Sequence, residues 1–406
     1  MKILFIVPYM PNLIRVRPYN LTRQLARLGH KVTVATLWTN EGEQADIGVL
    51  EQNNIEVLAL KQPKWRSAWS CLLALPTKTP LQAVYSWNQA LAREISGIVR
   101  CNGRAGYDVI HVEHIRGARY GLYLKSCFPE IPIVWDSVDC ISYLFEQAAG
   151  LSRSGFGKLI TRFELDRTRG YEGRLPEKFD HVLITSQEDK RALLDLVSGQ
   201  SSNVPISILP NGVDWEYFGE EEGYTREAAT VILSGKMSYH ANITMAMYLV
   251  NEIMPLVWQK RPDVRVLLAG KDPPAQIRSL MSNPAVTVTG TIDDIRPYIH
   301  LATVAVVPLI YGAGIQNKVL EAMACGTPVV TTPRAVLALD AEPGRDLLIA
   351  EQPAEFAGHI LALIEDRAFQ AQVGRAGRQY VEANHQWARI TGRLEGVYHE
   401  VIRTRN

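Results

Sequence analysis

Short apolar runs, each about the length of one β-strand, alternate with longer amphipathic stretches along nearly the whole chain. Ile3 to Val7 is the first run, and Lys31 to Leu37 alternates as the second. Further strands of this first series are expected at Ile55 to Leu60, Val109 to Val112, Ile131 to Trp135 and His181 to Thr185. Strands that alternate with helices form a parallel sheet covered on both faces, so the pattern predicts an α/β fold.

The first helical stretch carries its own start and stop signals. Pro18 suits a first helical position, where the missing N–H is not needed. Leu21, Leu25 and Leu28 then fall on one helical face, which predicts a buried stripe. Gly29 ends the helix.

A turn cluster from Leu209 to Asp214 separates this series from a second one. Strands of the second series are expected at Val231 to Ser234, Val264 to Ala269, Val286 to Val288, Val304 to Pro308 and Pro328 to Thr331. A helix from about Asn242 should bury one stripe made of Met245, Leu249, Ile253 and Val257.

The length of 406 residues also fits two domains better than one. We expect an N-terminal domain at 1–209, joined by a C-terminal helix at about 386–406, and a second domain at 210–385. The expected architecture is two doubly wound, Rossmann-like domains facing a cleft, with ligands bound at the carboxyl ends of the strands.

Composition excludes several classes of protein. The chain has 43 basic and 42 acidic residues, and this balance argues against bulk binding of nucleic acid. Its five cysteines are scattered without a C-x-x-C pair, as in reduced cytoplasmic proteins. The first ten residues look like a strand and not a signal peptide. The longest apolar stretch, Leu301 to Ile310, is shorter than the roughly 18 residues that span a membrane.

The segment from Val307 to Val330 carries the clearest chemistry. It is expected to form a strand, a glycine loop, a helix and a second strand. Gly312 and Gly314 allow the backbone to approach a ligand closely. The helix, opening near Ile315, would direct free N–H groups and its positive end toward an anion such as a diphosphate.

Lys318 and Glu321 lie three residues apart and therefore share one helix face. Lys318 would add a positive charge near the phosphates, and Glu321 would accept hydrogen bonds from two neighbouring hydroxyls, such as those of a ribose. The alternative is a surface ion pair on a helix behind an ordinary turn.

Three motifs resemble one enzyme family, the retaining glycosyltransferases of group 1, family four, which have the GT-B fold. Leu320 to Val330 matches the donor-helix motif L-E-A-M-A-x-G-x-P-V-V. Pro210 to Asp214 matches P-N-G-V-D, and Leu28 to Val34 matches L-G-H-x-V-T-V. More narrowly, the string from Gly314 to Met323 and the segment Arg174 to Leu194 resemble sugar transferases of exopolysaccharide or PEP-CTERM loci.

The resemblance implies transfer of a sugar from a nucleotide-sugar donor with retention of configuration. It implies that two lysines neutralise the negative charge of the diphosphate, namely Lys318 and Lys236, which follows Gly235. Arg15 or Arg17 would share this role. It places the base near backbone groups at Gly270 and Gly290.

Three positions depart from the family pattern. Ala313 replaces the first of two family glutamates, so backbone N–H groups of Gly314, Ile315 and Gln316, with Asn317 nearby, would contact the donor sugar. Pro11 to Arg15 replaces a glycine pair in the first loop, and Ala241 fills the second basic position of the diphosphate grip.

On the acceptor side, Glu113 occupies the position of an acceptor-contacting histidine of the family. Glu113 or the neighbouring His114 would orient the acceptor hydroxyl, or the two form a strand-end pair without a catalytic role. Asp136 and Asp139, near the end of the next strand, are candidate cleft residues or helix caps.

Two tryptophans flank basic residues in the segment Lys64 to Trp69, just before Leu72, Leu73 and Leu75. Tryptophan beside cations suits a lipid interface and so a lipid-linked acceptor with peripheral membrane contact. The commoner explanation, which we favour slightly, is that Trp65 and Trp69 pack inside the N-terminal domain.

The sequence contains no D-x-D pair and no H-x-x-x-H spacing beside a carboxylate, so no metal or other cofactor is expected. The expected partners are the nucleotide-sugar donor and a glycan, lipid-linked or small-molecule acceptor, with no nucleic acid. The expected location is the cytoplasm, including the inner face of the membrane. Rival functions are a nucleotide-sugar epimerase and a non-catalytic subunit that binds nucleotide sugars.

Overall fold

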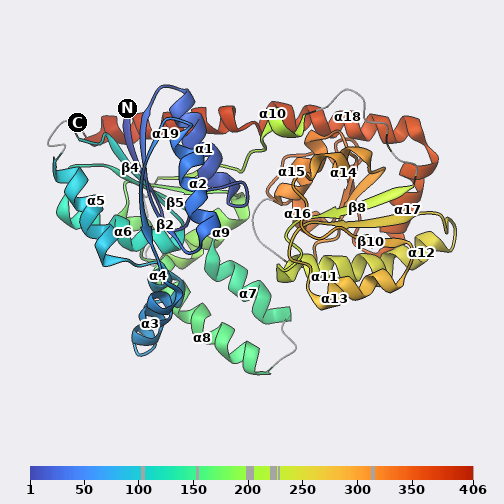
Figure 1. The fold of residues 1–406 in the computed structure, drawn as a ribbon, viewed down its shortest axis with the longest axis horizontal. Coiled ribbons are helices and arrows are strands. Elements are labelled where there is room, and N and C mark those ends of the chain that lie inside the picture. The colour runs from blue at the N-terminus through green and yellow to red at the C-terminus, as the bar shows by residue number, and fades with distance from the viewer. Residues whose placement is uncertain are drawn as a thin grey trace. The chain divides into compact units, whose positions relative to one another are not determined.

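The protein is described by a computed structural model that covers residues 1–101, 106–151, 155–197, 205–219, 226, 229–311 and 316–405 (Figure 1). Its contacts divide the chain into unit 1, Met1–Pro210 with Trp387–Asn406, and unit 2, Asn211–Gln386. Each unit holds one parallel sheet. The α/β prediction with two parallel sheets is therefore confirmed.

The sheet of unit 1 has the strand order β3-β2-β1-β4-β5-β6-β7, and all its paired strands are parallel. Its strands are β1 (Lys2–Val7), β2 (Lys31–Trp38), β3 (Ile55–Lys61), β4 (Val109–Glu113), β5 (Ile133–Val138), β6 (His181–Ile184) and β7 (Ile206–Ile208). The apolar run of β1 is inaccessible from Ile3 to Val7. Because this run is apolar on both faces, it suits a central strand with helices on either side.

The helices of unit 1 are α1 (Val16–Arg27), α2 (Glu41–Glu51), α3 (Lys64–Ala74), α4 (Leu81–Tyr85), α5 (Gln89–Cys101), α6 (His114–Cys127), α7 (Ile141–Leu151), α8 (Gly155–Glu172), η2 (Pro176–Lys178), α9 (Gln187–Leu196) and α19 (Trp387–Arg405). Leu21 and Leu25 of α1 are fully buried, as expected. Leu28 is not part of this stripe: it caps the helix at its C-terminus and is exposed. The last helix of the chain, α19, packs against α1 in the same unit.

The sheet of unit 2 has the order β10-β9-β8-β11-β12-β13. Its strands are β8 (Thr230–Ser234), β9 (Arg265–Ala269), β10 (Val286–Val288), β11 (Val304–Val307), β12 (Val329–Thr331) and β13 (Leu348–Ile349). Its helices are α10 (Trp215–Phe218), α11 (His240–Tyr248), η3 (Leu249–Ile253), α12 (Met254–Trp258), α13 (Ala275–Arg278), η4 (Ser279–Ser282), α14 (Arg296–Leu301), α15 (Asn317–Ala324), α16 (Pro333–Val336), α17 (Pro353–Glu365) and α18 (Arg367–Asn384).

The helical stretch expected from Asn242 is interrupted by the π-helical turn η3. Its four stripe residues, Met245, Leu249, Ile253 and Val257, are nevertheless all buried. A π-helical turn adds a residue to the helix without ending it, so α11, η3 and α12 still cover the sheet as one helical run.

In the Pro210–Asp214 turn, the residues from Asn211 onward form hydrogen bonds within unit 2. Asp214 caps α10 by accepting from the backbone N–H of Tyr217 at 3.3 Å. The Asn211 carbonyl lies 2.9 Å from Nδ1 of His385, and the N–H of Val213 donates to the His385 carbonyl at 2.7 Å. These bonds join the start of unit 2 to its end.

Candidate functional site

Two neighbouring strands of unit 2 end at glycines that no other residue can replace without strain. Gly235 follows β8 with φ +136°, and Gly270 follows β9 with φ +142°. A Cβ built on Gly270 would lie 1.9 Å from the carbonyl oxygen of Gly235, so the two backbones meet with no room for a side chain. At the carboxyl ends of β8 and β9, the backbone therefore carries no side chains at Gly235 and Gly270, near the start of α15.

Lys318 lies over this backbone. It is the second residue of α15, and its Cε atom is 3.3 Å from the Cβ that an alanine at position 235 would carry. The same Cβ would approach Nδ2 of Asn242 to 2.9 Å. Gly235 therefore makes the space that the Lys318 and Asn242 side chains occupy.

Lys318 and Glu321 form a desolvated pair of opposite charges. Burial lowers the pKa of Lys318 to about 8, and the charge of Glu321 opposes that shift. Burial raises the pKa of Glu321, opposed by the charge of Lys318. No hydrogen bond or ion pair joins either side chain to another residue in the part of the chain that the structure describes. An anion beside Lys318 would supply the interaction that burial takes from its ammonium group.

Asn242 is a residue that the sequence reasoning missed. Its Nδ2 donates to the Lys236 carbonyl at 2.8 Å, and its Oδ1 is buried without a hydrogen-bond partner. Lys236 itself is half-exposed, with Nζ 3.8 Å from Asp272. The backbone after β8 is thus fixed by Asn242, while the Lys236 side chain reaches solvent.

Tyr311, the last described residue before the glycine loop, is held by α11. Its hydroxyl lies 2.8 Å from Nδ1 of His240 and 3.3 Å from Oγ1 of Thr244. The Tyr311 and His240 rings are stacked with centroids 5.4 Å apart. Neither aromatic residue was predicted to belong to the site, because a lone histidine and tyrosine carry no motif.

Three predicted donor residues, Gly312, Gly314 and Ile315, lie outside the described residues. So does Ala313. The structure places the start of α15 at Asn317, with Gln316 as its N-cap, instead of near Ile315 as expected. Oδ1 of Asn317 accepts from Nδ2 of Asn211 at 3.3 Å, which connects α15 to the Pro210–Asp214 turn. Gly290 has φ +70° two residues after β10, at the same edge of the sheet.

The acceptor-side candidates lie on two paired strands of unit 1. Glu113 of β4 and Asp136 of β5 are partners in the parallel register. Oε1 of Glu113 accepts from the Tyr9 hydroxyl at 2.6 Å, while its Oε2 is buried without a hydrogen-bond partner. Burial and the charge of Asp136 raise the pKa of Glu113 to about 8. Glu113 is therefore protonated in neutral solution.

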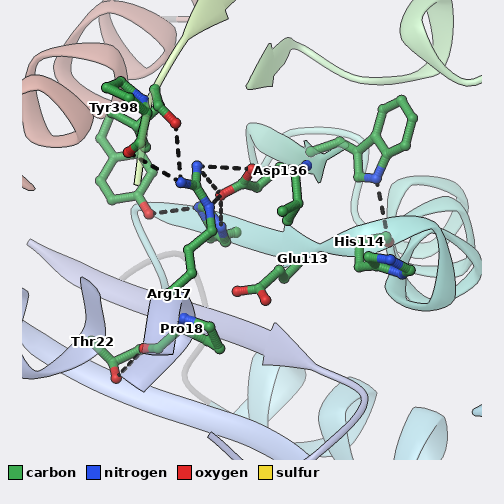
Figure 2. Close-up of polar contacts among 12 residues, drawn as sticks. Arg17, Pro18, Thr22, Glu113, His114, Asp136 and Tyr398 are labelled. Atoms are coloured by element: carbon green, nitrogen blue, oxygen red, sulfur yellow. Dashed lines mark hydrogen bonds and ion pairs between the residues drawn. The ribbon is translucent and has the colours of Figure 1, made fainter. Parts of the chain in front are cut away.

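Asp136 stays ionised because it is paired. Burial alone would raise the pKa of Asp136, but Arg17 and His111 hold it well below its usual range. Nε and Nη2 of Arg17 donate to the two carboxylate oxygens at 2.8 and 3.1 Å, and Nε2 of His111 lies 3.6 Å away (Figure 2). The Tyr398 hydroxyl of α19 is 2.8 Å from Nδ1 of His111. Two neighbouring carboxylates thus hold different protonation states.

The buried side chain of Arg17 forms hydrogen bonds with other residues of unit 1. Besides its bonds to Asp136, Nη1 of Arg17 donates to the carbonyls of Leu209 and Pro210 at 3.0 and 3.3 Å. The expectation that Arg15 or Arg17 shares phosphate charge stays a prediction; in this structure the buried guanidinium of Arg17 is neutralised by Asp136. Arg15 is partly exposed and pairs with Glu43 at 3.1 Å.

His114 is strained and uncharged. It begins α6 with φ +65°, which is unusual for a residue with a side chain. Burial, and then the charge of Arg116, lower the pKa of His114 to about 3. Its Nδ1 accepts from the backbone N–H of Arg116 at 3.3 Å. A neutral imidazole can accept or donate a hydrogen bond but cannot supply positive charge.

The suggestion that Asp136 or Asp139 caps a helix is wrong. The first N–H groups of α7 are accepted by Glu172, at 2.8 Å to Ile141 and 2.8 Å to Ser142. Asp139 accepts instead from Oγ1 of Thr185 at 3.3 Å. Burial and the charge of nearby Asp189 raise the pKa of Asp139 to about 7.

Packing does not account for the two tryptophans of α3. Trp65 is 68% exposed and Trp69 is 58% exposed, so the interpretation that they fill the core of the N-terminal domain is wrong. In the described ranges, no helix is long and apolar enough to cross a membrane. Among these same residues, no group of three or more His, Cys, Asp or Glu side chains is placed to hold a metal ion.

The chain matches two family descriptions. "Glycosyltransferase Family 4" matches residues 15–217, and "Glycosyl transferases group 1" matches residues 228–366. Among curated relatives, phosphatidyl-myo-inositol mannosyltransferase of Mycobacterium tuberculosis is 28% identical over 207 residues, 48% of this chain and 53% of that protein. The Mycobacterium leprae enzyme of the same name is 28% identical over 204 residues, with the same coverage. The chain thus spans about half the length of the curated relatives it matches.

Several solved structures share the fold. Sucrose-phosphate synthase of Thermosynechococcus elongatus has a TM-score of 0.69 at 17% identity, covering 99% of both chains. A glycosyltransferase of Rickettsia africae has a TM-score of 0.68 at 14% identity, covering 99% of this chain and 98% of that one. Anabaena HepE in complex with UDP has a TM-score of 0.65 at 16% identity, covering 98% and 100%. At these identities the likeness concerns the fold, and it confirms the two-domain GT-B architecture.

Proposed function

The chain belongs to the group 1 glycosyltransferases of family 4, and on this basis we propose that it transfers a sugar from a nucleotide-sugar donor with retention of configuration and without a metal ion. The acceptor is proposed to be a glycoconjugate, with a lipid-linked molecule favoured. The names of the mannosyltransferase relatives supply one support, since those enzymes act on a phosphatidyl-inositol. The narrower link to exopolysaccharide or PEP-CTERM loci stays a prediction.

The observation that carries the proposal is the partly desolvated Lys318 side chain beside Gly235, at the glycine-ended strands β8 and β9. Burial lowers its pKa to about 8, and Gly235 leaves room for its side chain. A diphosphate bound there would stabilise the charged form of Lys318 and raise its pKa again. The ammonium would stabilise the negative charge that grows on the diphosphate as the glycosidic bond breaks.

Other residues of unit 2 are proposed to contact the diphosphate, the ribose and the sugar of the donor. Lys236, half-exposed after β8, adds a second positive charge to the diphosphate. Glu321, which has no described side-chain partner, accepts hydrogen bonds from the ribose hydroxyls. Backbone N–H groups of Gly314, Ile315 and Gln316, with Asn317 beside them, contact the sugar in place of a glutamate at Ala313. Positive charge from two lysines is our reason for proposing that no metal is needed.

In the proposed reaction, the acceptor oxygen bonds to the anomeric carbon on the face that the diphosphate leaves. The bond between the anomeric carbon and the diphosphate oxygen breaks, and the leaving phosphate takes the acceptor proton. Glu113 orients the acceptor hydroxyl through its unpartnered Oε2, held in place by Tyr9. His114 offers a neutral ring nitrogen next to it in the chain.

A panel of UDP, GDP and ADP sugars tests the proposal in two steps. Thermal shift identifies the donor, because a ligand at 100 times its dissociation constant adds about 2.7 kcal/mol of stability. Release of free nucleotide is then measured with and without lipid and glycan acceptors. Acceptor-dependent release with retained anomeric configuration supports the proposal. Binding without release across all acceptors would instead identify a sugar-nucleotide-binding subunit, and isomerised donor an epimerase.

A further inference from the structure

One short helix of unit 1, α3, carries a cluster of exposed apolar side chains. Of the sixteen large apolar side chains that are exposed among the described residues, five fall between positions 65 and 75. Four of these are on α3, namely Trp65, Trp69, Leu72 and Leu73, which we call the α3 face. Single exposed apolar residues are ordinary, but a contiguous patch marks a surface that binds something.

The orientation of α3 is the reverse of that of a core helix. The α3 face has the spacing i, i+4, i+7 and i+8, which places its members on one stripe of the helix. The residues that α3 buries are the small ones, Ser67 and Ala74. The helix therefore turns its smallest side chains toward the unit and its largest toward solvent.

In the chain segment that contains the α3 face, all charged residues are basic, and the neighbouring Glu164 of α8 is buried and paired with Arg167. From residue 57 to residue 93 the sequence contains no Asp or Glu, while it contains Lys61, Lys64, Arg66, Lys78 and Arg93. Lys64 and Arg66 flank Trp65 and are exposed. A surface that complements this one must therefore be apolar with negative charge at its margin.

The apolar surface continues inward beside α3. A pocket of about 530 Å³ opens there, with Leu73, Val84, Trp87 and Leu122 in its lining. Ser70, Thr77 and Thr79 also line this pocket, and the guanidinium of Arg119 lies 4.4 Å from the centroid of the Trp87 ring. Figure 1 shows α3 next to α4 and α8, away from the sheet of its unit.

We propose that the α3 face docks onto the surface of an anionic lipid bilayer. The two tryptophan rings lie at the depth of the headgroups, Leu72 and Leu73 reach the acyl chains, and Lys64 and Arg66 meet anionic headgroups. A second copy of the chain fits less well, because a symmetric pairing would set Lys64 and Arg66 of each copy against each other without an acid between them. The inference rests on the proposed function for its purpose, since a docked enzyme meets a lipid-linked acceptor.

Flotation of the full chain with phosphatidylcholine vesicles, with and without phosphatidylglycerol, measures docking without donor or acceptor. We expect wild type to float with the anionic vesicles and to be released as salt is raised. Leu72→Ser should lower the partition constant roughly tenfold. Its matched control is Leu337→Ser in unit 2, because both leucines are 53% exposed. Lys64→Gln should weaken docking roughly fivefold, at about 1 kcal/mol per base, and Lys260→Gln should not.

Equal partition of Leu72→Ser and Leu337→Ser would overturn the inference. A wild type that does not bind anionic vesicles would also overturn it. So would a wild type that sediments as a dimer, if the double variant Trp65→Ser, Trp69→Ser sediments as a monomer. All these substitutions are at exposed positions, and unchanged circular dichroism checks the fold. Donor binding, measured by thermal shift on wild type, separates the two proposals: a wild type that binds donor but does not dock on anionic vesicles overturns only the docking of the α3 face.

Discussion

Replacing Lys318 by methionine should make the ligand-free protein more stable while it weakens donor binding. The side chain lies beside Gly235 in a desolvated position, without a partner among the described residues other than the nearby charge of Glu321. Methionine has a similar length and no charge, so it keeps the packing and removes the desolvation cost. A residue kept at a cost in stability is expected where binding needs its charge.

The size of the effect follows from the pKa of Lys318, which burial lowers from 10.5 to about 8. At 1.36 kcal/mol per pKa unit, the folded state loses about 3 kcal/mol when this lysine is charged. Removing Lys318 also leaves Glu321 without its compensating charge, which offsets part of the gain. We expect Lys318→Met to be more stable than wild type at pH 7 by roughly 1–3 kcal/mol.

The difference in stability between wild type and Lys318→Met should depend on pH in one direction. Below pH 8 the lysine is charged in both the folded and the unfolded chain, so the cost is fully present in wild type. Between pH 8 and 10.5 the unfolded state binds more protons, so wild-type stability rises relative to the variant. The difference between the two proteins should therefore shrink as the pH rises through this window.

Urea unfolding of both proteins at several pH values measures this difference, with the transition of unit 2 followed separately. Lys236→Met is the matched control, because Lys236 is half-exposed and its loss should change stability by only a few tenths of a kcal/mol. A Lys318→Met protein less stable than wild type at pH 7, or a difference that does not change with pH, would refute the reasoning. So would full donor-induced stabilisation of the variant.

Under donor saturation, Lys318→Ala should lower kcat by roughly 100-fold, while Glu321→Gln should mainly raise KM, because ribose hydroxyls change little during the reaction; near-wild-type kinetics in both would remove the donor-site assignment. Because burial raises the pKa of Glu113 to about 8, the acceptor hydroxyl meets a neutral carboxyl below this pH and a carboxylate above it, so the rate should change through pH 8 and Glu113→Gln should flatten that part of the profile; a wild-type profile in the variant contradicts the orienting role. Asp136→Asn removes the carboxylate charge that neutralises the buried Arg17 and should cost roughly 3–5 kcal/mol of stability, which denaturant unfolding measures; a loss under 1 kcal/mol would show that the ion pair is not needed. Turnover should survive EDTA, and loss of activity that Mg²⁺ or Mn²⁺ restores would contradict a metal-free mechanism.

The sequence determined those features that arise between near neighbours in the chain. Lys318 and Glu321 share a helix face because three residues make nearly one helical turn, and α15 contains both. The apolar run at Ile3 to Val7 had to be buried on both faces, and it forms β1. The beginnings of helices were less certain, since α15 starts at Asn317 and Leu28 lies outside the stripe of α1.

Tertiary structure alone decided which distant residues meet. Arg17 and Asp136 are 119 residues apart, and His111 and Tyr398 are 287 apart, so no local spacing relates them. The sheet order sets β4 beside β1 and β5, and α19 returns to this unit. Pairing with Arg17 keeps Asp136 charged while its neighbour Glu113 is protonated, a difference that two carboxylates in a sequence do not reveal.

The same limit explains the tryptophans of α3. An apolar stripe shows that a helix has a face to cover, and both packing and lipid contact satisfy that pattern equally. The choice depends on which side the rest of the unit occupies. Here the unit covers Ser67 and Ala74 and leaves Trp65 and Trp69 in solvent, because the neighbouring helices pack on the side with the small residues.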